Sequence, residues 1–378
     1  MDQPFVYLNN AATSFPKAPA VAREVAAALE RLPLEPGRTG GGGTDPLREC
    51  RKELARLLPG FVPERIVLTK NASEALNLAL LGLDLRGADV VATAGEHNSV
   101  LRPLHRLRES AGLRPHLVAC DPQGRAEAGE WLRALETWNP HLVVLNHASN
   151  VSGAVNDART LLGAAKAQGA LTLLDASQTA GMLPLDEVLP AADLVAFPGH
   201  KYLLGPPGTG VLAIREGVEL DSVFTGGTGG QSEAPTMPDG LPARLEVGTP
   251  NPVSFAGLSA SLGWLRGNAE DPTRIPGLAD SLTEALQRCG ARVVAVSGPR
   301  TGVVSFTLPG WTVRDAGMAL ERGQGVVCRA GLHCAPLIHA GLGTRPEGTV
   351  RFSLSRFTTP DELDRAVWAV DRMLHGAR

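Results

Sequence analysis

Two charged side chains in the middle of the sequence follow apolar runs and could share one reaction site. Asp175 ends the apolar run LTLL, and Lys201 follows the run LVAFPGH, 26 residues further along. This interval is long enough for a helix and one more strand, so neighbouring strands could carry both side chains into one cleft. A partly desolvated lysine amine forms Schiff bases with carbonyl compounds. A carboxylate at an apolar strand end needs a cationic partner, such as a protonated pyridine nitrogen.

An anion site is predicted where a helix directly follows a strand, at Asn71, Ala72 and Ser73. The start of a helix offers free backbone N–H groups and a positive dipole end to a phosphate, although an ordinary N-cap is the alternative interpretation. No lysine follows a glycine, so a Walker A loop is absent, and the glycine clusters at 37–43 and 226–230 do not fit the GxGxxG register. A lysine, an aspartate and an anion cradle together are what pyridoxal 5'-phosphate requires.

Seven short apolar runs predict strands that are buried on both faces, as in a mainly parallel sheet. They occupy residues 66–69, 90–93, 116–120, 141–146, 171–175, 194–197 and 211–214. Helical patterns lie between them, for example at 73–83, 99–110 and 157–169. The alternation favours an α/β fold in which helices cover both faces of the sheet and ligands bind at the carboxyl ends of the strands.

The pattern changes after Asn251 and predicts a second, smaller α+β domain. Its predicted helices are 254–267, 278–290 and 359–375, and its predicted strands are 293–298, 303–308, 326–331 and 350–357. We therefore expect a large domain over residues 15–255, and a small domain that combines residues 1–14 with 256–378.

Composition excludes several classes of partner. A net charge of -3, a pI near 6.3 and the lack of any run of five like charges argue against nucleic acid and anionic membranes. The N-terminus lacks a signal-peptide pattern, and no stretch reaches about 18 uncharged apolar residues, so we expect a cytoplasmic protein. Five cysteines without a CxxC motif favour free thiols. The group Cys328, His333, Cys334 and His339 does not match familiar zinc spacing, and we expect no metal.

Motifs along nearly the whole chain resemble one known family. They are YLNNAATSFPK (7–17), KNASEALNLAL (70–80), GEHNSVLRPL (95–104), NHASNVSGAV (146–155), LLDASQTAG (173–181), FPGHKYLLGPPGTG (197–210), LEVGTPNP (245–252), CRAGLHCAP (328–336) and VRFSLSRF (350–357). The chain resembles class V aminotransferase-fold enzymes, of PLP fold type I. Within them, it is most similar to the cysteine desulfurases and selenocysteine lyases with a short active-site loop.

The resemblance implies a role for each candidate cofactor residue. Lys201 resembles the lysine that forms the imine with the cofactor, Asp175 the partner of the pyridine nitrogen, and His97 a catalytic residue whose ring stacks on the cofactor. The other implied cofactor contacts are Asn150 and Gln178 near the phenolic oxygen, Ala72, Ser73 and His200 at the phosphate, and Thr249, which the family supplies across a homodimer interface. Relatives usually carry Ser or Thr where this chain has Pro198.

Cys334 resembles the nucleophile that takes sulfur from the substrate, and Arg329 and Arg351 resemble the arginines that bind the substrate carboxylate. A physical argument supports Cys334, because a reactive thiolate must be accessible and close to cations. Cys334 directly follows His333 and lies five residues after Arg329. The remaining cysteines fall on helical or strand patterns, where buried structural thiols are expected.

The implied activity is conversion of L-cysteine to L-alanine, with the sulfur passed to Cys334 as a persulfide and then to an acceptor protein. Other reactions on the same scaffold stay open, namely selenocysteine lyase, cysteine sulfinate desulfinase, aminotransferase or epimerase activity. A weakly active protein that binds a sulfur carrier is a further alternative. Of the four other lysines, Lys17, Lys52 and Lys166 are expected to be solvated.

Overall fold

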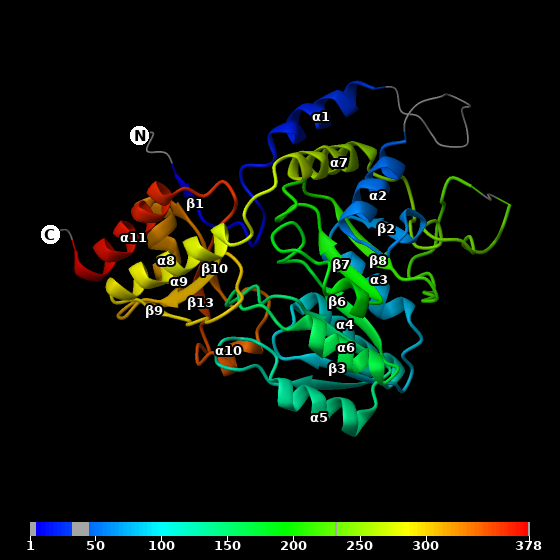
Figure 1. Ribbon diagram of the computed structural model, residues 1–378, viewed down its shortest axis with the longest axis horizontal. Helices are drawn as coiled ribbons and strands as arrows, with labels where there is room; N and C mark the ends of the chain where they lie inside the picture. Colours follow the sequence, from blue (N-terminus) through cyan, green and yellow to red (C-terminus); the bar gives the residue numbers. More distant parts are fainter. Residues whose placement is uncertain (1–4, 32–44, 231–232, 377–378) are drawn as a thin grey trace.

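The computed structural model describes residues 5–31, 45–230 and 233–376, and a seven-stranded sheet lies at its centre (Figure 1). The strands lie in the order β2-β8-β7-β6-β5-β3-β4. They are β2 (Ile66–Thr69), β3 (Asp89–Thr93), β4 (Arg114–Val118), β5 (Leu142–Asn146), β6 (Leu171–Asp175), β7 (Leu194–Pro198) and β8 (Gly210–Ile214). Only β8 runs against its neighbours, and the other pairs are parallel. The predicted mainly parallel sheet is confirmed.

Helices cover both faces of this sheet and create two separate apolar cores. One face packs against α2 (Pro46–Leu57), α5 (Ala128–Trp138), α6 (Ala158–Ala167) and α7 (Pro252–Gly267), and the other against α3 (Ala72–Gly82) and α4 (Asn98–Ala111). Val143 belongs to the first core and Val144 to the second, because successive strand side chains point to opposite faces. Burial on both faces therefore explains why the strands read as continuous apolar runs.

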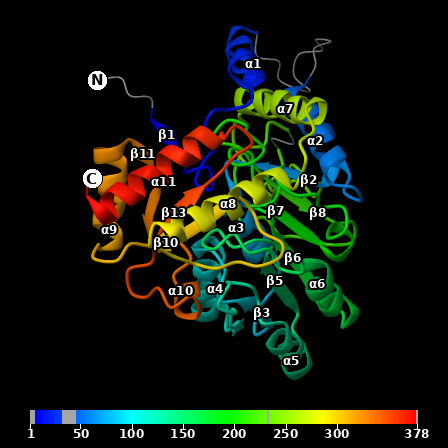
Figure 2. The same ribbon diagram turned by 60° about the vertical axis from the view of Figure 1, so that its left-hand side comes forward.

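A smaller antiparallel sheet, in the order β12-β13-β10-β9, lies beside the large one (Figure 2). Its strands are β9 (Arg292–Val293), β10 (Val303–Thr307), β12 (Arg329–Gly331) and β13 (Thr349–Ser353). The helices α8 (Arg274–Arg288) and α11 (Pro360–His375) pack around its aromatic pair Phe306 and Phe352. Two short helices, α9 (Val313–Met318) and α10 (Ile338–Gly341), complete this part, which matches the predicted α+β region.

Three predicted strands of this region were wrong in extent. The strand predicted at 350–357 ends at Ser353 in β13, and the other two differ in their pairing. The run 326–331 is divided at Cys328 into β11 (Val326–Val327) and β12, because β11 pairs with β1 (Val6–Tyr7) whereas β12 pairs with β13. The predicted strand 293–298 reduces to β9, which pairs with β10 through two residues only. In both cases the partner strand, which is distant in sequence, decides where the strand ends.

The helix α7 connects the two parts and packs against α1 (Pro19–Glu30) (Figure 1). It also packs against α2, which covers the large sheet. The predicted boundary at 255 falls inside α7, and the division into 15–255 and 1–14 plus 256–378 stays a prediction. The glycine cluster 37–43 lies outside the described residues. No helix in the described part of the chain combines the length and apolarity needed to cross a bilayer.

Candidate active site

A cavity of about 210 Å³ lies at the carboxyl ends of the parallel strands and gathers most of the predicted residues. The predicted residues that line it are Ala72, Ser73, His97, Asn150, Asp175, Gln178, His200, Lys201, Arg329 and Arg351. Thr249 and Cys334 are not part of its lining, and Thr249 is exposed to solvent. The argument from strand ends thus predicted Asp175 and Lys201, and the family resemblance predicted most of the other residues that line the cavity.

Lys201 and Asp175 reach the cavity from neighbouring strands, β7 and β6. Burial lowers the pKa of the Lys201 amine from its ordinary value to about 8. The nearby guanidinium groups of Arg351 and Arg329 act in the same direction, whereas Asp175 opposes them. Asp175 is buried, and its Oδ1 accepts a hydrogen bond from the Ser177 N–H at 2.9 Å. The site thus holds an amine that is neutral in a substantial fraction near physiological pH.

His97 is the N-cap of α4, and this role fixes its ring. The Ser99 backbone N–H donates to His97 Nδ1 at 3.0 Å, so this nitrogen serves as an acceptor. Burial lowers the pKa of His97 to about 4, and the Lys201 charge adds to the effect. His97 therefore lines the cavity as a neutral imidazole with Nδ1 engaged. The Ser99 hydroxyl also contacts the Ser73 hydroxyl at 2.6 Å, which joins the starts of α4 and α3.

The start of α3, where an anion site is predicted, lines the cavity. The Asn71 side chain caps the helix by accepting the Glu74 N–H at 2.9 Å, and the first turn lines the cavity with Ala72 and Ser73. Three buried polar atoms of other cavity residues have no hydrogen-bond partner in the described part of the chain, namely His200 Nδ1, Gln178 Oε1 and Arg351 Nε. Unpaired buried polar atoms are costly, so a polar ligand is the physical explanation that the cavity offers.

Arg329 and Arg351 lie directly opposite each other on β12 and β13. Arg351 is buried and donates to the Asn150 carbonyl oxygen at 2.8 Å, and its Nε has no partner. Burial, together with Arg329, lowers the pKa of Arg351 to about 10. No carboxylate in the described residues forms a recorded ion pair with either arginine. Two guanidinium groups that face each other on adjacent strands repel each other. A bound carboxylate would relieve this repulsion, so the pair indicates a carboxylate-binding site.

Cys334 lies beside this arginine pair. Its Sγ accepts a hydrogen bond from Arg329 Nη2 at 3.0 Å, and its carbonyl oxygen accepts the Asn98 N–H at 2.7 Å. His333 and Cys334 have φ angles of 51° and 60°, a left-handed conformation that is unfavourable for such side chains and is typical of functional sites. By contrast, burial raises the pKa of the Cys50, Cys120 and Cys328 thiols to about 12. Cys334 alone among these four lies against a cation that lines the cavity.

Lys17 was wrongly expected to be solvated. Its Nζ donates to the His200 carbonyl oxygen at 2.8 Å, to Ser14 Oγ at 3.0 Å and to Thr13 Oγ1 at 3.2 Å. Burial lowers the pKa of its amine to about 8. Lys17 thus holds the N-terminal loop against the residue that precedes Lys201. Its place at the end of the YLNNAATSFPK motif was the signal that could have revealed this.

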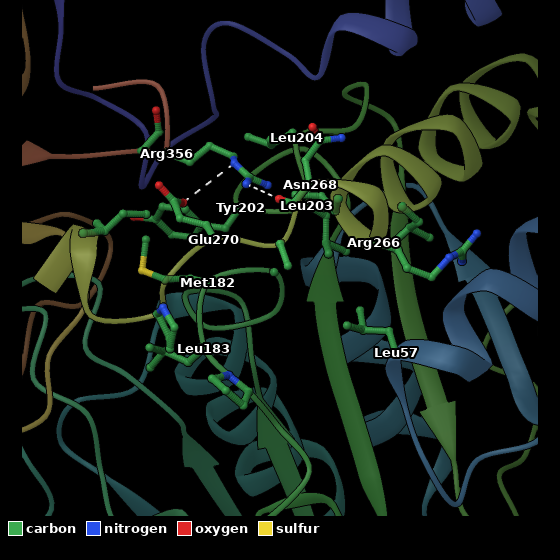
Figure 3. Close-up of a pocket in the computed structure, with 18 of the residues that line it drawn as sticks. Leu57, Met182, Leu183, Tyr202, Leu203, Leu204, Arg266, Asn268, Glu270 and Arg356 are labelled. Atoms are coloured by element: carbon green, nitrogen blue, oxygen red, sulfur yellow. Dashed lines mark hydrogen bonds and ion pairs between the residues drawn. The ribbon is translucent and has the colours of Figure 1, made fainter. Parts of the chain in front are cut away.

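A second cavity, of about 400 Å³, is lined in part by the residues that follow Lys201 in the chain (Figure 3). Tyr202, Leu203 and Leu204 line it, together with leucines of α2 and α7. Its arginines are already paired. Arg356 contacts Glu270 at 3.7 Å, and Arg266 forms an ion pair with Glu53. Unpaired ionic groups therefore distinguish the smaller cavity, and we assign the chemistry to it.

No group of three or more His, Cys, Asp or Glu side chains in the described ranges is arranged to hold a metal ion. Cys328, His333, Cys334 and His339, which were weighed as a cluster in the sequence, do not form one. His333 Nε2 instead contacts Thr349, and His339 Nδ1 contacts Thr344.

Comparison with known proteins agrees with this geometry. The family model for aminotransferase class V matches residues 6–366. A probable cysteine desulfurase of Methanothermobacter thermautotrophicus is 34% identical and covers 95% of this chain and 92% of its own. A probable cysteine desulfurase of Pyrococcus abyssi is 30% identical and covers 100% of this chain and 96% of its own. The apo structure of a cysteine desulfurase from Thermococcus onnurineus NA1 has a TM-score of 0.88 at 30% identity, and covers 99% of this chain and 95% of that chain. The chain therefore belongs to the aminotransferase class V family.

Proposed function

We propose that this chain is a pyridoxal 5'-phosphate-dependent cysteine desulfurase. Overall, L-cysteine and the Cys334 thiol become L-alanine and a Cys334 persulfide. The observation that carries the proposal is the contact between Cys334 and Arg329, which lines the same cavity as Lys201 and Asp175. Relatives and a solved structure named cysteine desulfurase, which match along nearly the whole chain, support the same reaction.

The cavity fits pyridoxal 5'-phosphate by the chemistry of its donors and acceptors. It offers an amine on Lys201, a carboxylate on Asp175, a helix start for the phosphate and unpaired polar atoms on His200 and Gln178. Bound there, the cofactor supplies a carbonyl for the amine and an electron sink for the α-carbon of an amino acid. The residues proposed to hold it are Ala72, Ser73, His97, Asn150, Asp175, Gln178, His200, Lys201 and, from the neighbouring subunit, Thr249.

Lys201 is the proposed carrier of the proton that leaves the substrate α-carbon. With a pKa of about 8, its amine can accept a proton and return it close to neutral pH. His97 is poorly placed to share this task, because its pKa is about 4 and Ser99 already engages its Nδ1. We assign His97 the stacking role, in which a neutral ring covers the cofactor.

Arg329 and Arg351 are the proposed anchors of the substrate carboxylate, because their opposed charges have no anionic partner. Arg329 also holds the sulfur of Cys334, because its Nη2 donates a hydrogen bond to Sγ. The thiolate attacks the substrate sulfur and forms the S–S bond. The bond between Cβ and sulfur breaks with its electron pair left on the carbon side, and proton return to Cβ gives alanine.

The test is turnover of L-cysteine with alanine and sulfide measured in the presence and absence of a reductant. We expect Cys334→Ala to lose about 100-fold or more of the alanine formation, because no other thiol can take the sulfur. Cys289→Ala is the matched control and should turn over normally, since Cys289 lies at the end of α8 and outside the cavity. Unchanged turnover in Cys334→Ala would contradict the persulfide mechanism. Retained cleavage of selenocysteine alone would indicate a selenocysteine lyase instead.

The proposal extends to the assembly and its surroundings. We propose a cytoplasmic homodimer in which exposed Thr249 reaches the neighbouring subunit's phosphate site. The persulfide on Cys334 must leave for the enzyme to turn over again, so we also propose a thiol-bearing acceptor protein. Partial exposure of Cys334 at the arginine pair is consistent with such transfer.

A further inference from the structure

The carboxyl group of Glu96 is buried beside the cavity and forms no ion pair within the described part of the chain. Glu96 is 0% exposed and lies in the turn between β3 and α4, directly before His97. Its Oε1 accepts hydrogen bonds from Thr93 Oγ1 and from the Asn146 backbone N–H, both at 2.9 Å. Its Oε2 is buried without any partner. A carboxylate in this setting would carry an uncompensated buried charge, which is among the costliest features of a protein interior.

The groups around Glu96 make ionisation harder still. Asn146, at the end of β5, is the register partner of Asp175 on β6, so β5 separates Glu96, which follows β3, from Asp175 at the same edge of the sheet. Cys120, which follows β4, is the other titratable side chain facing it, and its thiol has a raised pKa of its own. Burial and then Asp175 raise the pKa of Glu96, to about 8, although hydrogen bonds from Asn146 and Thr93 oppose the shift. Burial is thus the main cause that favours the protonated form of Glu96, and the negative charge of Asp175 adds to it.

We propose that Glu96 is a positioning residue, held as a neutral carboxylic acid, that fixes the turn carrying His97 and leaves Asp175 as the single negative charge among the residues that line the cavity. The geometry shows how it acts. Glu96 Oε1 joins the end of β3 to the end of β5, and Asn146 Nδ2 donates back to the Gly95 carbonyl oxygen at 3.1 Å. These reciprocal bonds set where His97 enters α4, and Asn146 itself lines the cavity.

The charge of Glu96 matters for the reaction, and this part of the inference rests on the proposed function. An ionised Glu96 would add a second anion next to Asp175, and this field would favour the protonated form of the Lys201 amine. A neutral Glu96 avoids this effect and leaves Asp175 to pair with the pyridine nitrogen. Protonation of Glu96 thus supports an amine that is neutral near physiological pH.

The protonation state can be measured directly by infrared spectroscopy of the full-length holoenzyme between pH 6 and pH 9.5. We expect the C=O stretching band of a protonated carboxyl group at pH 7, which fades as the pH rises past about 8. The band should be missing in Glu96→Gln and present in Glu64→Gln, a control at an exposed carboxylate. A wild-type spectrum without this band at pH 7 would overturn the inference. This measurement on the wild type requires neither a folded variant nor desulfurase activity.

Two variants then test the positioning role. Glu96→Gln keeps an acceptor for Thr93 and Asn146 without a charge, so its kcat and KM at pH 7 should stay within about threefold of wild type. Glu96→Ala removes the acceptor and should lose about tenfold or more in kcat.

The thermal midpoint of Glu96→Gln, relative to wild type, should rise between pH 6 and pH 9. The reason is that the folded carboxyl has a higher pKa than the unfolded one, so wild type loses stability as the pH rises through this range. A midpoint difference that is flat with pH, or equal kinetic loss in both variants, would contradict the assignment.

Discussion

At the scale of residues, the candidate site is a set of charged groups whose usual partners are missing. Arg351 faces Arg329 on the adjacent strand, and Asp175 is the group that most favours the positive form of the half-buried Lys201. Stable proteins pair such groups, as the second cavity does with Arg356 and Glu270. Unpaired buried charge is tolerated where a ligand completes the pairing, so these residues identify the site independently of any relative.

The first residue-scale prediction concerns the pH dependence of cofactor attachment at Lys201. Imine formation needs the neutral amine, and the pKa of this amine is lowered to about 8. The rate at which an absorbance band near about 420 nm develops should therefore rise nearly tenfold per pH unit up to about pH 8, and then level off. Stopped-flow mixing of cofactor-free protein with pyridoxal 5'-phosphate measures this rate.

Two variants decide whether that band belongs to Lys201. Lys201→Ala should not develop it at any pH. Lys52→Ala should behave as wild type, because Lys52 lies on α2 and pairs with Glu49 at the surface. A rate that keeps rising to pH 10 would show that the pKa of the Lys201 amine is not lowered. This result would contradict the electrostatic description of the cavity.

At the scale of elements, the junction between β2 and α3 positions the anion cradle. Gly210 opens β8 and pairs with Thr69, the last residue of β2, so that β8 passes directly beneath Asn71. A Cβ atom on Gly210 would lie 2.4 Å from the Asn71 carbonyl carbon and 2.6 Å from its Cα. The backbone of Asn71 cannot move aside as a flexible side chain can. Asn71 can therefore cap α3 only because residue 210 has no side chain.

We predict that Gly210→Ala displaces the start of α3 and weakens cofactor binding by about tenfold or more. Overpacking should also cost about 1–3 kcal/mol of folding free energy. The matched control is Gly163→Ala, in the helix α6, where a new Cβ meets nothing within 4 Å. This control should gain about 0.5–1 kcal/mol from helix propensity and keep its cofactor affinity. Fluorescence titration with pyridoxal 5'-phosphate measures the cofactor affinity, and thermal melting measures the change in stability. Normal cofactor affinity in Gly210→Ala would disprove the role of the junction.

At the scale of the whole molecule, the cavity is built from both parts of the chain. The large sheet supplies Lys201 and Asp175, and the small sheet supplies Arg329 and Arg351. The contacts between Arg351 and the Asn150 carbonyl oxygen, and between Asn98 and Cys334, join the two parts at the site. Thr249 is the exception, since it is exposed and does not reach the cavity of its own chain.

Mixed dimers test whether Thr249 acts across a subunit interface. Thr249→Ala should weaken cofactor binding, and Lys201→Ala should be inactive. Refolding an equal mixture of the two should restore about one quarter of the wild-type activity at limiting cofactor, because half of randomly formed dimers hold one intact site of two. Activity that stays at the level of the separate variants would place Thr249 in the site of its own chain. A protein that sediments as a monomer would also contradict the dimer.

The sequence by itself determined the order of strands and helices and the strand-end residues Lys201, Asp175 and His97. Those features depend on local apolar patterning, which is readable because each strand is buried on both faces. The tertiary structure decided that Arg329 faces Arg351, that Lys17 binds the carbonyl of His200 and that Glu96 Oε2 is buried without a hydrogen-bond partner among the described residues. Such pairings depend on sheet register and on contacts between distant segments. Register and burial belong to the packed molecule, so no local pattern could have disclosed them.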